Sequence, residues 1–313
     1  MWLPYENAFQ IAVVLVVFVV ALHRVAQRPD RRGLKIAVTT ATELAVVMVL
    51  YGVWQKVREL AVTKTAGAME NARSLWDFEQ RIHMPSELAL QKVFIDNRPI
   101  MQFLNVYYGG AHVPAAGALL IWVFWRHRDR YAAVRNTFAL TIAGCITIQA
   151  LVPMAPPRFL TDLGFIDAGL KYHLSVYGTG GSGVSNELAA MPSLHVGWCV
   201  LVALAVIAIS TSRWKWLILL HPVLTILSIT ITANHWWLDG VVAVMVLSVA
   251  WALQHVGRLA YDRLLARFPR LVHGADPIPQ PVAVVGGDVV ERHAEDLAQG
   301  IEPIGAGHQR SSV

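Results

Sequence analysis

Charged residues are scarce in this sequence. Asp, Glu, Lys and Arg make up 15% of its 313 residues, whereas hydrophobic residues make up 55%, and the mean hydropathy is +0.47. A soluble globular protein is about one quarter charged. The shortage of charge therefore excludes an ordinary soluble domain. It predicts a polytopic membrane protein whose backbone is helical wherever it meets lipid.

Cysteine is equally scarce, and acidic residues are fewer than basic ones. Cys145 and Cys199 both lie inside apolar runs and lack the spacing of zinc ligands, so we interpret them as small buried apolar residues. The formal net charge is +5. Its basic residues stand in short segments between apolar runs and form no stripe, which argues against nucleic-acid binding.

What the sequence has is a series of apolar runs, most of them close to the roughly 20 residues that cross a bilayer as a helix. They cover residues 8–22, 36–54, 100–125, 137–154, 192–210, 214–233 and 235–256. The expected fold is an all-α membrane bundle of about seven transmembrane helices. In the polar region between the second and third runs, Pro85-Ser86-Glu87 opens a predicted amphipathic helix that extends to Phe94 and suits the membrane surface.

Three regions follow from these runs. Residues 1–33 hold an extra N-terminal span and a basic loop, residues 34–270 hold the main membrane domain, and residues 271–313 are rich in Pro, Gly and charge, which predicts a mostly disordered tail. Glu6 precedes the first run, and Arg24 and Arg28 follow it. This order of charge predicts an uncleaved span rather than a secretory signal.

The distribution of basic residues predicts the orientation. Segments 23–35, 126–135, 212–215 and 257–270 hold fifteen Lys and Arg and three Asp, whereas segments 55–99 and 158–190 hold nine Lys and Arg and nine Asp and Glu. The positive-inside rule then places the C-terminal tail in the cytoplasm. The heads of the fifth and seventh runs fall on the extracytoplasmic face. We expect a plasma membrane location.

His235 and Asp239 stand at the head of the seventh run. They are four positions apart, so a helix would present them on one face. Ionisable residues at membrane depth are costly and tend to be functional. A carboxylate beside a histidine can orient the ring and stabilise its charged form. The alternative is a histidine at the membrane interface, beside the belt residues Trp236 and Trp237.

The segment Met191-Pro192-Ser193-Leu194-His195 stands at the head of the fifth run. Pro192 suits the first position of a helix. The backbone N–H groups that come next would then attract an anion. Ser193 adds a hydroxyl, unless it is only a helix cap, and His195 could protonate a leaving oxygen.

Two further features could hold phosphate. Arg158 follows the prolines that end the fourth run, and an arginine grips phosphate through two parallel hydrogen bonds, although it can equally snorkel to lipid headgroups. Residues 178–183, Gly-Thr-Gly-Gly-Ser-Gly, suit either a phosphate nest or a plain loop.

These motifs carry a family resemblance. Residues 190–198, Ala-Met-Pro-Ser-Leu-His-Val-Gly-Trp, followed by 233–239, Ala-Asn-His-Trp-Trp-Leu-Asp, resemble the type 2 phosphatidic acid phosphatase (PAP2) superfamily. With 155–158, Ala-Pro-Pro-Arg, and with Tyr108 and His112 upstream, the chain looks closest to the inositolphosphotransferase branch, similar to fungal inositol phosphorylceramide synthase. The likeness covers roughly residues 70–257.

The resemblance implies roles for these residues. His235 would be the nucleophile that takes the phosphoryl group, Asp239 would orient it, and His195 would serve as general acid and then base. Arg158 and the backbone at Ser193 would hold phosphate oxygens, and no metal or other cofactor would be needed. The substrate would be a phospholipid or polyprenyl phosphate, and the acceptor inositol, another lipid alcohol or water.

The chain departs from the broader superfamily pattern at three positions. Leu151 replaces a lysine, Leu194 replaces a glycine, and Ile229 replaces an arginine. Two phosphate-binding cations are thus missing, which favours the inositolphosphotransferase branch over a plain phosphatase. His112, Tyr108 and Lys171 are candidates to replace them.

Other classes of function remain open on the sequence alone. A proton-coupled transporter would use His and Asp as a relay, but it predicts them near mid-bilayer rather than at helix ends. A zinc hydrolase would use His195, His235 and Asp239 as ligands. An acyl hydrolase would use Ser193 as its nucleophile.

Overall fold

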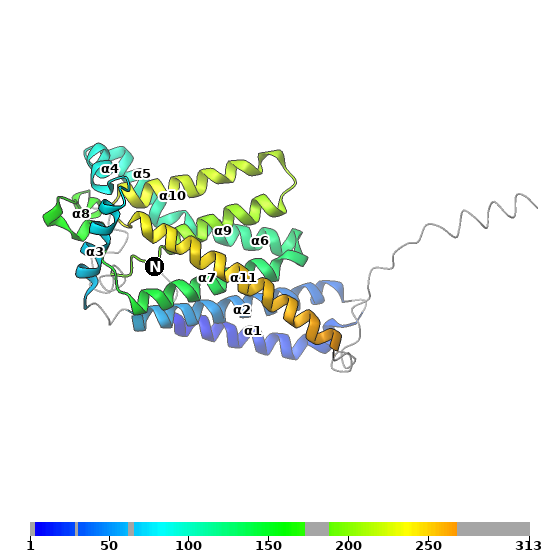
Figure 1. The fold of residues 1–313 in the computed structure, drawn as a ribbon. Helices are drawn as coiled ribbons and strands as arrows, with labels where there is room; N and C mark the ends of the chain where they lie inside the picture. Colours follow the sequence, from blue (N-terminus) through cyan, green and yellow to red (C-terminus); the bar gives the residue numbers. More distant parts are fainter. Residues whose placement is uncertain (1–3, 29–30, 62–65, 173–187, 268–313) are drawn as a thin grey trace, which may run out of the picture. The chain divides into compact units, whose positions relative to one another are not determined.

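The structure is a computed structural model that describes residues 4–28, 31–61, 66–172 and 188–267 (Figure 1). The chain divides into one unit spanning Met1–Arg258 and another spanning Leu259–Val313. The first unit contains every candidate site residue. The predicted tail at 271–313 and the glycine-rich stretch at 178–183 lie outside the described residues.

Within the described ranges the chain is helical and has no strand, which confirms the predicted all-α class. The helices are α1 (Tyr5–Ala26), α2 (Arg32–Ala61), α3 (Ala68–Arg81), α4 (Glu87–Phe94), α5 (Arg98–Gly110), α6 (His112–Arg126), α7 (Arg128–Leu151), α8 (Ala168–Lys171), α9 (Leu194–Ile209), α10 (Leu220–Ile231) and α11 (Trp237–Arg267). A 3₁₀ helix, Arg213–Leu219, leads into α10.

The candidate membrane spans follow the predicted runs in order. Five segments are long and apolar enough to cross a bilayer alone: α1, residues 32–56 of α2, α7, residues 213–231 and α11. Helices α5 and α6 qualify together as a bent pair, and α9 is a shorter apolar helix. The protein is therefore a multi-pass membrane helical bundle.

The third predicted span is not one straight helix, which corrects the prediction for residues 100–125. It breaks between α5 and α6 with a bend of 44°. Pro114, in the first turn of α6, has no N–H to donate to the carbonyl of Gly110, and a missing hydrogen bond of this kind kinks a helix. The bend separates Tyr108, near the end of α5, from His112, at the start of α6.

Two glycines allow the spans to pack closely. A Cβ on Gly144 of α7 would lie 2.7 Å from Cγ1 of Val246 on α11, and a Cβ on Gly52 of α2 would lie 2.9 Å from the ring of Phe9 on α1. Only glycine fits at such approaches. Helix α2 also meets α7 through an ion pair between Glu43 and Arg135.

Helices α3, α4 and α8 gather at one end of the spans (Figure 1). An aromatic cluster packs α3 and the segment before α8 against the residue that precedes α11. The ring of Trp236 lies 6.0 Å from that of Trp76 in α3 and 5.9 Å from that of Phe165, centroid to centroid. The helix predicted from Pro85 to Phe94 is present as α4, with the Ser86 hydroxyl accepting from the N–H of Ala89. This end of the bundle carries the candidate site.

Candidate active site

The connection between α10 and α11 sets the position of His235. At the end of α10 the N–H of Asn234 donates to the Ile229 carbonyl at 2.8 Å, and the N–H of Ala233 donates to Thr230 at 3.0 Å. This is a Schellman turn with Ala233 at φ 54°, a conformation that normally favours glycine. The predicted span 235–256 placed His235 at the start of a helix. Helix α11 begins only at Trp237, so His235 lies before the helix.

His235 and Asp239 are in contact, but for a different reason from the one predicted. Asp239 is the third residue of α11, and its Oδ2 reaches back over the helix N-terminus. There it accepts from the N–H of Trp236 at 2.9 Å and lies 3.2 Å from Nδ1 of His235. A carboxylate at the third helical position that accepts from the N–H of the N-cap residue forms one of the two hydrogen bonds of a capping box. The pair therefore depends on the cap and not on a shared helical face.

The hydrogen bonds of His235 define its tautomer. Nδ1 lies 2.8 Å from the carbonyl oxygen of Ala190 as well as 3.2 Å from Asp239 Oδ2. Both oxygens accept only, so we assign the ring proton to Nδ1. Nε2 then keeps its lone pair, which is the form that a nucleophilic nitrogen requires.

Ser193 is the N-cap of α9, which is one of the two roles considered for it. Its Oγ accepts from the N–H of Val196 at 3.4 Å, and its own N–H donates to the Asp239 carbonyl at 3.1 Å. Pro192 thus precedes the cap and does not occupy the first helical position, contrary to the prediction. The Ser193–Asp239 bond ties the two sequence motifs together directly.

Three aromatic rings surround His195, the second residue of α9, and form a cluster with it. Its ring centroid lies 4.4 Å from Tyr108, 4.6 Å from His112 and 5.7 Å from His235. His112 places Nδ1 3.2 Å from the Tyr108 carbonyl and Nε2 3.2 Å from the hydroxyl of Thr225. Nδ1 of His195 is buried and has no hydrogen-bond partner among the described residues. The fold therefore brings together Tyr108, His112, His195 and His235, four of the residues that the sequence singled out.

Arg158 is buried beside the turn that precedes His235. Its backbone N–H donates to the Ala233 carbonyl at 3.0 Å, and its Nη1 donates to Oδ1 of Asn234. Nε lies 3.3 Å from Oδ2 of Asp167, which starts α8. Lys171 is also in α8, where it forms an ion pair with Asp96 at 2.7 Å and not with the histidine cluster.

Two carboxylates that the sequence analysis missed complete the N-terminus of α11. Oε1 of Glu87 accepts from the N–H of Trp237 at 3.2 Å, and Oε1 of Glu79 accepts from the N–H of Leu238 at 2.9 Å. Both side chains are fully buried, like Asp239. Three acidic residues thus bind three successive N–H groups of the helix that follows His235.

Burial changes the protonation of this acidic group. Burial and, to a smaller extent, the neighbouring Glu87 together raise the pKa of Glu79 to about 9. Burial also raises the pKa of Glu87, against the lowering effect of its hydrogen bonds. Since two adjacent buried carboxylates repel each other, we infer that the pair retains a proton at neutral pH.

A signal for Glu79 is present in the sequence. Ala68, Ala72 and Leu75 of α3 belong to the core or pack against it, and they repeat at the spacing of one helical face. Glu79 continues that face. A carboxylate in an apolar stripe is the kind of exception that indicates a buried partner.

The described residues contain no group of three His, Cys, Asp or Glu side chains placed to bind a metal ion together. The trio proposed for zinc does not form such a group. Oδ2 of Asp239 instead contacts Nδ1 of His235 and caps the helix. The geometry offers two histidines beside the N-termini of two helices.

Comparison with known proteins agrees with this geometry. The family model described as PAP2 superfamily matches residues 73–253, which is more than half of the chain. The chain belongs to the PAP2 superfamily. No curated protein and no solved structure matches it.

Membership sets the class of chemistry and its extent. The PAP2 match supports a phosphatase or phosphotransferase that acts on lipid-like substrates in a membrane. It begins within α3 and ends within α11, so it contains every candidate site residue. Helices α1 and α2 lie outside the matched region.

Proposed function

We propose that this PAP2 protein is a lipid phosphotransferase that works through a phosphohistidine at His235. It would move a phosphoryl or phospho-head group from a membrane lipid to an alcohol, inositol or another lipid, with water as the alternative acceptor. The observation that supports it most is the pairing of His235 Nδ1 with Asp239 and Ala190, which leaves Nε2 unprotonated. The inositolphosphotransferase-like motifs favour an alcohol over water.

The first step would be attack of Nε2 on phosphorus. An N–P bond forms, the P–O bond to the leaving group breaks, and His195 gives its proton to the leaving oxygen. The ring of His195 lies 5.7 Å from that of His235, centroid to centroid, so the two histidines are close enough to act on one phosphoryl group. Asp239 would balance the positive charge that develops on the His235 ring.

The second step reverses the first. His195 takes the proton of the acceptor hydroxyl, the acceptor oxygen bonds to phosphorus, and the N–P bond breaks, which restores His235. Phosphate oxygens would be held by Arg158 and by the first N–H groups of α9. Tyr108 and His112 line the same cluster and would contact the substrate.

The decisive experiment uses purified protein in liposomes with a labelled phospholipid or polyprenyl phosphate, with and without inositol. Released phosphate and transferred head group are both measured. His235→Asn should abolish both products and also the acid-labile label that the phosphohistidine intermediate leaves on the protein. His23→Asn, an exposed change on α1, should alter none of these. Full activity in His235→Asn would refute the nucleophile assignment.

Two further arms address the acceptor and the other mechanisms. If more head group is transferred to inositol than phosphate is released, the transferase is supported. If the amount of released phosphate is unchanged by any added alcohol, the protein is a phosphatase. Loss of activity in a chelator, restored by zinc, would replace the phosphohistidine scheme by a metal mechanism. Complete loss in Ser193→Ala would favour an acyl-hydrolase type of nucleophile.

We further propose that the site faces the outside of the plasma membrane and that the tail is cytoplasmic, from the distribution of basic residues. Leu170→Cys on α8 and Arg130→Cys on α7 lie on opposite sides in this scheme, and both positions are exposed. The native Cys145 and Cys199 are buried. A membrane-impermeant maleimide on intact cells should label only Leu170→Cys, and the opposite pattern would invert the topology.

A further inference from the structure

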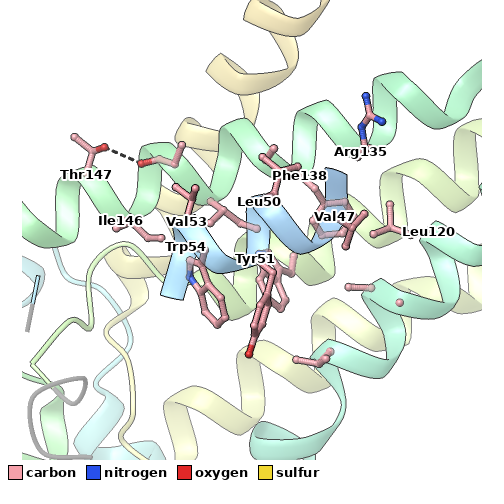
Figure 2. Close-up of a pocket in the computed structure, with 17 residues that line it drawn as sticks. Val47, Leu50, Tyr51, Val53, Trp54, Leu120, Arg135, Phe138, Ile146 and Thr147 are labelled. Atoms are coloured by element: carbon pink, nitrogen blue, oxygen red, sulfur yellow. Dashed lines mark hydrogen bonds between the residues drawn. The ribbon is translucent and has the colours of Figure 1, made fainter. Parts of the chain in front are cut away.

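A cavity of about 390 Å³ lies between α2, α6, α7 and α9 (Figure 2). This volume is within the range of small-molecule sites, about 300–1,000 Å³. Its lining residues lie within positions 47–54 of α2, 113–120 of α6 and 135–147 of α7, with Trp198 of α9. Nearly all of them are apolar, and a cavity of this kind does not hold water.

The cavity runs along the spans. Its lining on α7 extends from Arg135 to Thr147, which is about 18 Å of helix at 1.5 Å per residue. Figure 2 shows these two residues at opposite ends of the labelled row on α7. Arg135 forms its ion pair with Glu43, so a charged pair stands at this end of the cavity. The shape is that of a slot parallel to lipid chains.

The other end of the slot lies toward the histidine cluster along α6 and α9. Val113 directly follows His112 on α6, and Trp198 comes one helical turn after His195 on α9. Trp198 also contacts Trp54 of α2, with 6.5 Å between ring centroids. Each of these two lining positions thus shares a helix with a ring of the candidate site.

One polar group in the lining is left without a partner. The indole N–H of Trp198 is buried and has no hydrogen bond among the described residues. A buried donor usually has an acceptor. An oxygen near the head of a bound lipid, such as an ester carbonyl or a phosphate-ester oxygen, would satisfy it.

We propose that this slot binds one hydrocarbon chain of the lipid substrate, so that the phosphate of the same lipid reaches His235. The proposal rests on the proposed phosphotransfer and assigns a task to α2, which lies outside the region matched by the superfamily. A lipid chain gains little by moving from bilayer to protein, because both are apolar. The slot therefore acts by alignment, and the charged pair at its Arg135 end limits the chain length that fits.

Gly117 gives a clean test. A Cβ at this position meets no atom within 4 Å, so Gly117→Leu adds a side chain where the slot has open space and replaces glycine by a better helix former. Ala118→Leu on the same helix is the matched control, because Ala118 is exposed and does not line the slot.

The first measurement is kcat/KM for lipid phosphates with one head group and chains of increasing length, in acyl and isoprenoid series. In the parent protein and in Ala118→Leu, kcat/KM should rise with length and then level off. In Gly117→Leu the values for long chains should fall about tenfold or more, as expected for added carbons in an apolar pocket. Values for the shortest chains should stay unchanged. Identical profiles for the two variants would overturn the proposal.

The second measurement does not depend on turnover. Lipid phosphates with a photoreactive group on an acyl or an isoprenoid chain are cross-linked to the parent protein in nanodiscs. Labelled peptides should come from α2, α6 and α7 lining residues, and Gly117→Leu should lose several-fold more of this label than Ala118→Leu. Label restricted to exposed faces would refute the slot, even if phosphotransfer is confirmed. Slot label without turnover on any lipid would retain the site and refute the proposed function.

Discussion

The N-termini of α9 and α11 meet at the site, and their caps differ in charge. Helix α9 is capped by the neutral hydroxyl of Ser193. Its next N–H groups, on Leu194 and His195, have no acceptor among the described residues. Helix α11 binds three carboxylates, Asp239, Glu87 and Glu79, at its first N–H groups.

The difference separates two tasks that a phosphotransfer site must perform. A helix N-terminus with open N–H groups favours an anion, so the start of α9 suits a phosphate. At α11 the same N–H groups are already bound to acids, so this end fixes His235 in place and offers it a negative partner. We infer that α9 holds the substrate and α11 holds the nucleophile.

The largest expected effect is at the acid that contacts the nucleophile. Asp239→Asn keeps an oxygen to cap Trp236 but removes the charge that stabilises the His235 ring. By analogy with the triad aspartate of serine proteases, kcat should fall by up to about 10⁴-fold. Steady-state phosphotransfer in detergent measures it, with Asp129→Asn, an exposed change at the start of α7, as control. A loss no larger than in the control would remove Asp239 from the mechanism.

A smaller effect is expected at the neutral cap. Ser193→Ala should lower the free energy of unfolding by about 0.5–2 kcal/mol, as for loss of other serine N-caps, and leave measurable activity. Ser212→Ala removes a similar cap at Arg213–Leu219, away from the site. If KM for the lipid phosphate rises in Ser193→Ala but not in Ser212→Ala, the α9 terminus contacts the phosphate. Equal KM values in both variants would contradict the inference that the start of α9 holds the substrate.

The smallest effect is a change in pH dependence at the acidic cap. The pKa of Glu79 is raised to about 9 from its ordinary value of 4.5. Between these values the unfolded chain has lost a proton that the folded chain keeps, so stability falls as pH rises from about 5 to 9. Glu79→Gln cannot titrate, and its amide oxygen can still accept from Leu238.

Melting temperatures in detergent across that pH range test this prediction. The decline in Tm toward pH 9 should be shallower in Glu79→Gln than in the parent, whereas Glu70→Gln, an exposed change on the same helix, should follow the parent. A slope that is unchanged in Glu79→Gln would mean that the buried pair does not retain its proton.

Apolar runs predicted the membrane spans well, because a lipid-facing helix has to be apolar along its whole length. One exception was the fifth run, whose helix α9 is shorter than a full span, so the described residues hold five or six candidate spans where about seven were expected. The other exception was the break between α5 and α6. Gly110 and Pro114 were visible in the sequence, but whether such a pair bends a helix depends on what packs around it. The bend then matters for the site, because Tyr108 and His112 line the cluster from its two sides.

Within the site, sequence spacing predicted that His235 and Asp239 would meet, yet the physical reason was different. Spacing by four implied one helical face, whereas the contact forms because Asp239 caps α11 and His235 lies in the preceding turn. Glu79 and Glu87 were missed altogether. They lie about 150 residues before the helix that they cap, and no local pattern reports such a pairing.

The sequence by itself determined that the chain is a multi-pass membrane protein and predicted the residues proposed to carry its chemistry, since both follow from composition and short motifs. Only the tertiary structure decided how those residues are held. Caps, tautomers and the slot beside α2 depend on atoms brought together from distant segments. Such contacts form because buried polar groups need partners and because helices pack by shape. The spacing of residues along the sequence does not show which distant segments meet these two requirements.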